Sequence, residues 1–129
     1  EGTPEHRAIS ARWPQPTLYD AFARFLVGRG HNVPKALLER DVTQPMQEWP
    51  EMQDTLLELY RNHPVERGVC ELLVDLDEGI QEWRYRHVKM VERTIGRKSG
   101  TGGSTGVEYL AASLHRPVFP DLWAIRSRM

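Results

Sequence analysis

The chain has 129 residues, of which 40% are apolar, and its 17 basic and 18 acidic side chains give a formal net charge of −1. This is the length of one domain, with enough apolar residues for a modest core. The charge balance argues against nucleic acid as a partner, and no apolar run is long enough to span a membrane. The single cysteine, Cys70, cannot form an internal disulfide. We therefore expect a cytoplasmic protein.

The start of the chain, Glu1-Gly2-Thr3-Pro4, has neither an initiator methionine nor an apolar signal core, so we expect a longer protein. Residues 1–16 contain three prolines and predict an irregular lead-in. Thr17 is a favourable N-cap for a helix that ends near Gly28, with Gly30 as the residue after its C-cap. Further helices are predicted at Pro34–Arg40 and Glu51–Asn62, with a proline-bounded loop over 41–50 between them.

The longest predicted helix follows Pro64 and ends at Gly96. Apolar or weakly polar residues recur in it at alternating steps of four and three, which is the spacing of one helix face. These residues are Val69, Leu73, Leu76, Ile80, Trp83, His87, Met90 and Thr94. We expect this stripe to be buried against other helices.

A glycine-rich loop, Gly100-Thr-Gly-Gly-Ser-Thr-Gly106, comes next. It lacks the Lys of a P-loop, does not complete a dinucleotide-binding GxGxxG, and follows a helix where both motifs follow a strand. A linker and a lid that orders over a ligand both remain open, and the position between two apolar segments favours the lid. Beyond it, Val107–Leu114 predicts two helical turns, and Asp121 is expected to cap a short terminal helix. No strand alternation occurs, so the predicted fold is an all-α helical bundle.

His87 lies on the apolar stripe, one turn after Trp83. A histidine there is either a hydrogen-bonded core residue or a metal ligand. Zinc needs three or four protein ligands, and His87 has no partner at ligand spacing. Haem needs only one axial residue, because the porphyrin supplies the other four nitrogens. The remaining histidines, His6, His31, His63 and His115, are interpreted as surface or turn residues, and Cys70 as a buried structural thiol.

Several motifs resemble the tryptophan 2,3-dioxygenase family. They are W-R-Y-R-H (83–87), M-V-E-R-T-I-G (90–96), G-T-G-G-S-T-G-V-E-Y-L (100–110) and F-P-D-L-W-A-I-R (119–126), with P-T-L-Y-D-A-F (16–22) and L-L-E-R-D-V-T-Q-P (37–45) upstream. The resemblance covers nearly the whole chain but only the carboxyl-terminal half of a family subunit. It implies one domain over 1–129, with a helical scaffold at 17–98, a substrate loop at 99–106 and C-terminal helices at 107–129.

The resemblance implies that His87 is the axial ligand of haem b iron and that Thr101 contacts the amino acid portion of bound L-tryptophan. It also implies that Trp83 lies on the proximal side, where its indole N–H would help to orient the imidazole. The implied reaction is cleavage of the indole 2,3-bond of L-tryptophan by O₂, giving N-formylkynurenine and so opening the kynurenine route of tryptophan degradation. The implied assembly is a homotetramer that includes the amino-terminal half of each subunit. The family's distal catalytic residues lie in that half, and no residue here takes their roles.

Two alternatives remain at this stage. The same haem scaffold can serve monooxygenation or peroxidation of another aromatic substrate. The chain can also be a non-catalytic helical fragment that requires a partner half, because its long apolar stripe needs burial whatever His87 does.

Overall fold

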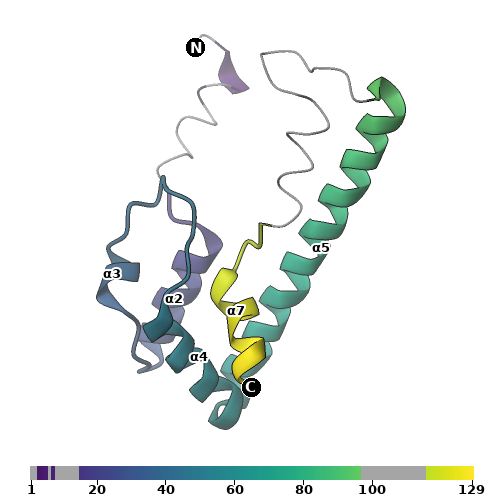
Figure 1. Cartoon of the computed structure of the whole chain (residues 1–129). Helices are drawn as coiled ribbons and strands as arrows, with labels where there is room; N and C mark the ends of the chain where they lie inside the picture. Colours follow the sequence, from purple (N-terminus) through teal and green to yellow (C-terminus); the bar gives the residue numbers. More distant parts are fainter. Residues whose placement is uncertain (1–2, 6, 8–14, 97–115) are drawn as a thin grey trace.

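The structure is a computed structural model that describes residues 3–5, 7, 15–96 and 116–129. Every regular element in these ranges is helical, which confirms the predicted all-α class (Figure 1). The elements are α2 (Leu18–Gly28), α3 (Lys35–Leu38), α4 (Pro50–Asn62), α5 (Pro64–Ile95), α7 (Pro120–Ala124) and the 3-10 helix η3 (Ile125–Arg128). None of the helices in the described part combines the length and the apolar character needed to cross a membrane.

Helix α2 begins and ends where the sequence predicts. The Asp20 backbone N–H donates to Thr17 Oγ1 over 3.3 Å, and the Thr17 backbone N–H donates to Asp20 Oδ2 over 2.8 Å. This reciprocal capping box satisfies two amides that the helix itself leaves unpaired. At the other end Gly30 has a φ of 87°, a left-handed conformation that glycine adopts without a steric penalty. The turn directs the chain toward His31, whose N–H donates to the Leu26 carbonyl over 3.0 Å.

The hydrophobic core lies where α4 contacts α5, α7 and η3, with α2 packed beside it. Leu26, Leu56 and Leu122 are fully buried there, and burial of each leucine side chain contributes about 1.5–3 kcal/mol. Cys70 belongs to the same core, and desolvation raises the pKa of its thiol to about 12. The interpretation of Cys70 as a buried structural thiol is therefore confirmed.

Two buried aspartates fasten the C-terminal segment to the rest of the molecule. Asp77 of α5 accepts hydrogen bonds from the backbone N–H of Val118 (3.0 Å) and Phe119 (2.8 Å) and from Trp123 Nε1 (2.8 Å). Asp121 accepts from the Tyr19 hydroxyl over 2.7 Å. The prediction that Asp121 caps the terminal helix is wrong, because Phe119 occupies the N-cap and the Asp121 side chain points into the core.

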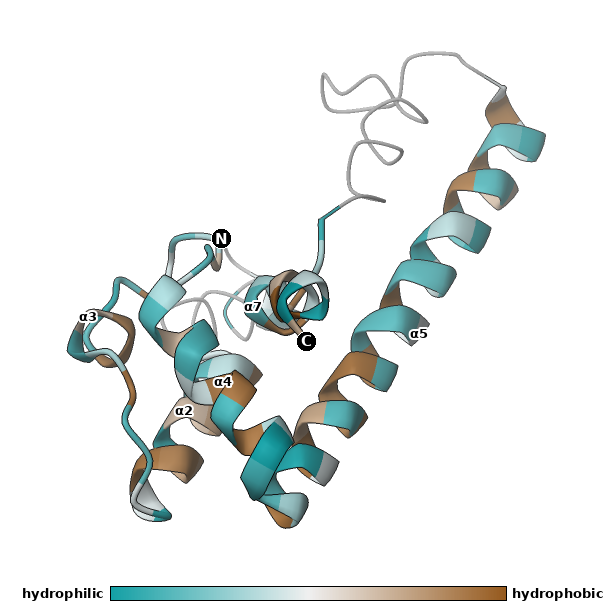
Figure 2. Ribbon diagram, turned by 60° about the horizontal axis from the view of Figure 1, so that its bottom comes forward, coloured by the Kyte–Doolittle hydropathy of each residue, from teal (hydrophilic) through white to brown (hydrophobic). Residues whose placement is uncertain are grey.

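The prediction for the buried face of α5 holds at Val69 and Leu73, which pack in or against the core, and is wrong farther along the helix. Figures 1 and 2 show α5 running past α2, α3, α4 and α7. Three residues of the predicted stripe, Leu76, Trp83 and Met90, are 44%, 63% and 56% exposed. The buried residues are Glu66, Cys70, Leu73, Val74, Asp77 and Val88, and they lie on a neighbouring sector that shares only Leu73 with the predicted stripe. That sector includes Glu66 and Asp77, whose carboxylates are buried because hydrogen-bonding partners satisfy them. Hydropathy alone therefore predicts the wrong buried sector of α5.

Smaller differences concern element boundaries. Helix α3 covers only Lys35–Leu38, and α4 begins one residue earlier than predicted, at Pro50. Pro4, Glu5 and Arg7 are helical, so the lead-in is not irregular throughout. The loop at 99–106 and the turns at 107–114 lie outside the described residues.

Candidate functional site

His87 and Trp83 form a stacked pair on α5. Their ring centroids are 5.0 Å apart and their planes are 6° from parallel. The imidazole is partly buried, and neither of its ring nitrogens has a hydrogen-bond partner among the described residues. A core histidine of this kind would normally be hydrogen-bonded. His87 is instead partly buried, so water can reach its ring nitrogens, and the Trp83 contact is made through the ring face.

The surface around His87 is largely apolar and exposed. Exposed Leu76, Trp83 and Met90 lie on the same sector of α5 because their offsets from one another are multiples of seven residues, close to whole helical turns. A flat, largely apolar macrocycle requires this kind of surface, and a neutral imidazole nitrogen is the axial ligand it needs from the protein. Nearby charges are paired: Arg86 Nη2 lies 2.9 Å from Glu82 Oε1, and Lys89 Nζ lies 3.2 Å from Glu92 Oε1.

Segment 97–115, which includes Thr101, lies outside the described residues, but the residues that flank it are placed. Gly96 ends α5 with a φ of 62°, and its N–H donates to the Glu92 carbonyl over 2.8 Å. On the other flank, Arg84 Nη1 donates to the Arg116 carbonyl over 2.6 Å. Arg84 is three residues before His87, so Gly96 lies beyond His87 on α5 and Arg116 contacts the turn of α5 that precedes His87.

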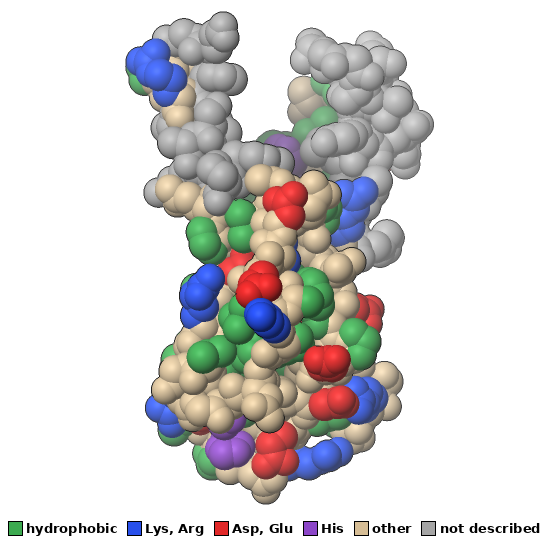
Figure 3. Space-filling view, turned by 90° about the vertical axis from the view of Figure 1, so that its left-hand side faces the viewer, with side chains coloured by type: hydrophobic (Ala, Val, Ile, Leu, Met, Phe, Trp, Pro, Cys, Tyr) green, Lys and Arg blue, Asp and Glu red, His purple; other side chains and the backbone are tan. Residues whose placement is uncertain are grey.

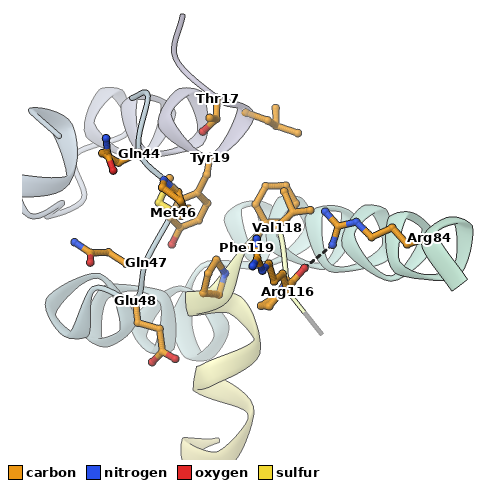
Figure 4. Close-up of a pocket in the computed structure, with 14 residues that line it drawn as sticks. Thr17, Tyr19, Gln44, Met46, Gln47, Glu48, Arg84, Arg116, Val118 and Phe119 are labelled. Atoms are coloured by element: carbon orange, nitrogen blue, oxygen red, sulfur yellow. Dashed lines mark hydrogen bonds between the residues drawn. The ribbon is translucent and has the colours of Figure 1, made fainter. Parts of the chain in front are cut away.

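A pocket of about 590 Å³ opens beside Arg84 (Figure 4). Its walls come from the start of α2, from the loop before α4 and from the segment before α7, represented by Tyr19, Met46 and Phe119. Arg84 and Arg116 bring positive charge to it, and Glu48 brings negative charge. The side chain of Arg84 is turned by about 60° from that of His87 around the axis of α5. Arg84 lines the pocket and His87 does not, so the pocket lies next to the helix face that carries His87.

One spatial cluster of residues was not identified from the sequence. His31 and His63, treated above as separate surface or turn residues, pack against each other with Glu66 beside them. The spacing His63-x-x-Glu66 on the first turn of α5 was a usable signal. No sequence signal indicated that His31 would lie beside them, because its position depends on how α2 packs against the rest of the fold.

Comparison with known proteins identifies the family to which this chain belongs. The family model described as tryptophan 2,3-dioxygenase matches residues 55–129. A tryptophan 2,3-dioxygenase of Herpetosiphon aurantiacus is 52% identical over 96% of this chain and 47% of its own length. Those of Anaeromyxobacter sp. strain K and Kineococcus radiotolerans are 48% and 46% identical, over 99% and 98% of this chain and 48% and 45% of their own lengths.

The chain belongs to the tryptophan 2,3-dioxygenase family, as its motifs predicted. It spans about half the length of the curated relatives it matches. The matched region 55–129 contains both His87 and Thr101.

Proposed function

We propose that this chain supplies the proximal haem face and the substrate loop of a haem-dependent dioxygenase, which cleaves the indole 2,3-bond of L-tryptophan with O₂ to give N-formylkynurenine. The observation that carries the proposal is the His87 imidazole, stacked on Trp83 and without a hydrogen-bond partner in the described part of the chain. Membership of the family supports the same assignment.

In this proposal His87 binds the iron of haem b and Trp83 holds the imidazole plane by stacking. The haem, when bound, supplies the O₂ chemistry. Thr101 binds the charged amino acid portion of tryptophan, and segment 99–106 excludes water from the substrate. The position of Gly96 and Arg116 on either side of His87 supports this role for the segment. The remaining half of the subunit would supply the distal residues, in a cytoplasmic homotetramer.

The proposal is tested by replacing His87 with glycine in the purified protein. The Soret absorbance per protein should fall to near the background of free haem, because the only axial ligand from this face is removed. Added imidazole should restore the band by occupying the space of the lost side chain. His63→Gly removes a histidine from the far end of the same helix and should leave the spectrum unchanged. A His87→Gly protein with the wild-type haem spectrum would contradict the proposal.

A further inference from the structure

Three side chains with metal-binding atoms meet at the end of the molecule where α4 passes into α5. The ligand atoms of His31, His63 and Glu66 lie within 4.8 Å of one another. The two imidazoles are packed edge to face, with ring centroids 4.6 Å apart. In Figure 3 histidine and acidic side chains lie together at the lower end of the molecule, at the height of this junction in Figure 1.

The backbone positions these groups from two separate segments. His63 is the N-cap of α5 and Glu66 lies in its first turn, so both project from the same helix end. His31 follows the left-handed turn at Gly30, which brings it over that helix end. His31 Nε2 contacts Glu66 Oε2 at 2.5 Å. A site that links residues 35 positions apart, through elements fixed by the core, is largely assembled before a ligand arrives.

The burial of the three side chains suits a bound ion. The side chains of His31 and Glu66 are 11% and 5% exposed, while that of His63 is 38% exposed and gives a route from solvent. The Glu66 carboxylate is held from two sides, with Arg29 Nε 3.0 Å and His31 Nε2 2.5 Å from its Oε2. Glu58 Oε2 lies 3.7 Å from His63 Nε2 and is itself held by Asn62 Nδ2 at 2.8 Å. A carboxylate beside a metal-binding imidazole orients the ring and strengthens its donor nitrogen.

Arg29 is the competing cation at this position. Its Nε lies 3.0 Å from Glu66 Oε2, and its side chain is 45% exposed. A metal ion would take the place of the His31–Glu66 contact and share the carboxylate with Arg29 or displace it toward solvent. Bonds of about 2.0–2.2 Å in tetrahedral geometry place ligand atoms roughly 3.3 Å apart. Binding an ion therefore needs only small side-chain movements: His31 Nε2 and Glu66 Oε2 separate from 2.5 Å, and the ligand atom of His63 moves closer to both.

We propose that His31, His63 and Glu66 form a binding site for a divalent transition-metal ion of the zinc type, separate from the proposed haem face. Two imidazoles and one carboxylate suit Zn²⁺ and its neighbours, whereas Ca²⁺ and Mg²⁺ prefer sets made only of oxygen ligands. Three protein ligands leave a fourth position to water. The ion would clamp the turn after α2 to the start of α5.

The test is titration of the purified protein with Zn²⁺ alone, followed by calorimetry, with Co²⁺ as a visible-absorption probe of the same site. One ion should bind per chain, and His31→Ala and His63→Ala should each weaken binding by at least about tenfold, since even an outer partner of a ligand contributes that much. Arg29→Gln should strengthen binding, because it removes the cation that competes for Glu66. A damaged fold cannot produce this gain.

His87→Ala serves as the control and should bind Zn²⁺ as the wild type does, which separates this site from the haem proposal. Unchanged Zn²⁺ binding in both His31→Ala and His63→Ala would overturn the proposal. So would the lack of saturable binding below roughly 1 mM, which corresponds to a binding free energy of about −4 kcal/mol. Unchanged or weaker binding in Arg29→Gln would overturn it as well.

Discussion

Trp83 lies flat against His87, with ring planes 6° apart and centroids separated by 5.0 Å, although the indole is 63% exposed. An exposed indole normally has freedom to rotate. Here it covers one face of an imidazole that has no hydrogen-bond partner in the described residues. Within this chain the orientation of the His87 ring therefore depends on the stack.

Removing the stack should weaken haem binding without abolishing it. An aromatic pair contributes about 0.5–1.5 kcal/mol beyond its buried area, which corresponds to as much as about tenfold in affinity. Haemin titration of Trp83→Ala should show this loss, and Trp83→Phe should recover part of it. Tyr85→Ala is the control, because Tyr85 is an exposed aromatic residue of the same helix that does not stack on His87. Equal losses in Trp83→Ala and Tyr85→Ala would count against a specific role for the stack.

Thr101→Ala should weaken L-tryptophan binding and leave the haem content unchanged. A hydrogen bond to a charged group contributes about 1.5–3 kcal/mol, so we expect a loss of roughly 10- to 100-fold in substrate affinity. The measurement is a spectral titration of the haem protein with tryptophan. Thr101→Ser keeps the hydroxyl and should bind nearly as the wild type does, and Ser104→Ala tests a neighbouring hydroxyl of the same loop. Parallel loss of haem in Thr101→Ala would indicate a structural role instead.

Asp77→Asn should destabilise the fold strongly. Asp77 is fully buried and accepts from Val118, Phe119 and Trp123, and an asparagine amide would turn N–H groups toward those donors. We expect a loss of about 2–4 kcal/mol in the free energy of unfolding, measured by urea denaturation. Asp75→Asn, an exposed change two residues earlier, should cost less than about 0.5 kcal/mol. Similar midpoints for the two variants would refute this role of Asp77.

The ion pair between Asp20 and Arg40 should make stability depend on pH in the acid range. Their side chains are 8% and 6% exposed, and Arg40 Nε lies 2.8 Å from Asp20 Oδ1. Burial alone raises the pKa of Asp20, but hydrogen bonds from Arg40 and Thr17 outweigh it and lower the pKa below the ordinary value of 3.8. The unfolded chain therefore takes up the proton first. The stabilisation is complete above the ordinary pKa and is lost as the pH falls through the folded value.

The check is the difference in unfolding free energy between wild type and Asp20→Asn, measured from about pH 6 to pH 2. This difference should shrink as the pH falls. Asp54→Asn removes an exposed pair with Arg128, at 2.7 Å, and its difference should stay small throughout. A constant difference for Asp20→Asn would show that its carboxyl has the same pKa in both states.

Local chemistry made much of the fold predictable. Thr17, Gly30 and Gly96 mark helix ends through capping and left-handed backbone, and these positions agree with the structure. Only Val69 and Leu73 of the core-facing side of α5 were predicted in this way, because Glu66 and Asp77 are buried through partners distant in sequence. His87 and Trp83 were identified from helical spacing and family motifs, and the structure adds their stack. The grouping of His31 with His63 required tertiary packing that no local pattern encodes.

The two residues that flank segment 97–115, Gly96 and Arg116, are both held by helix α5. Gly96 lies nine residues after His87, and Arg116 is held by Arg84 three residues before it. Along the helix these attachment points are about 18 Å apart, with His87 between them. Loss of the Arg84 contact would leave Val118 and Phe119 still held by Asp77, so the C-terminal helix would keep its place while the flank at Arg116 loses its contact with α5.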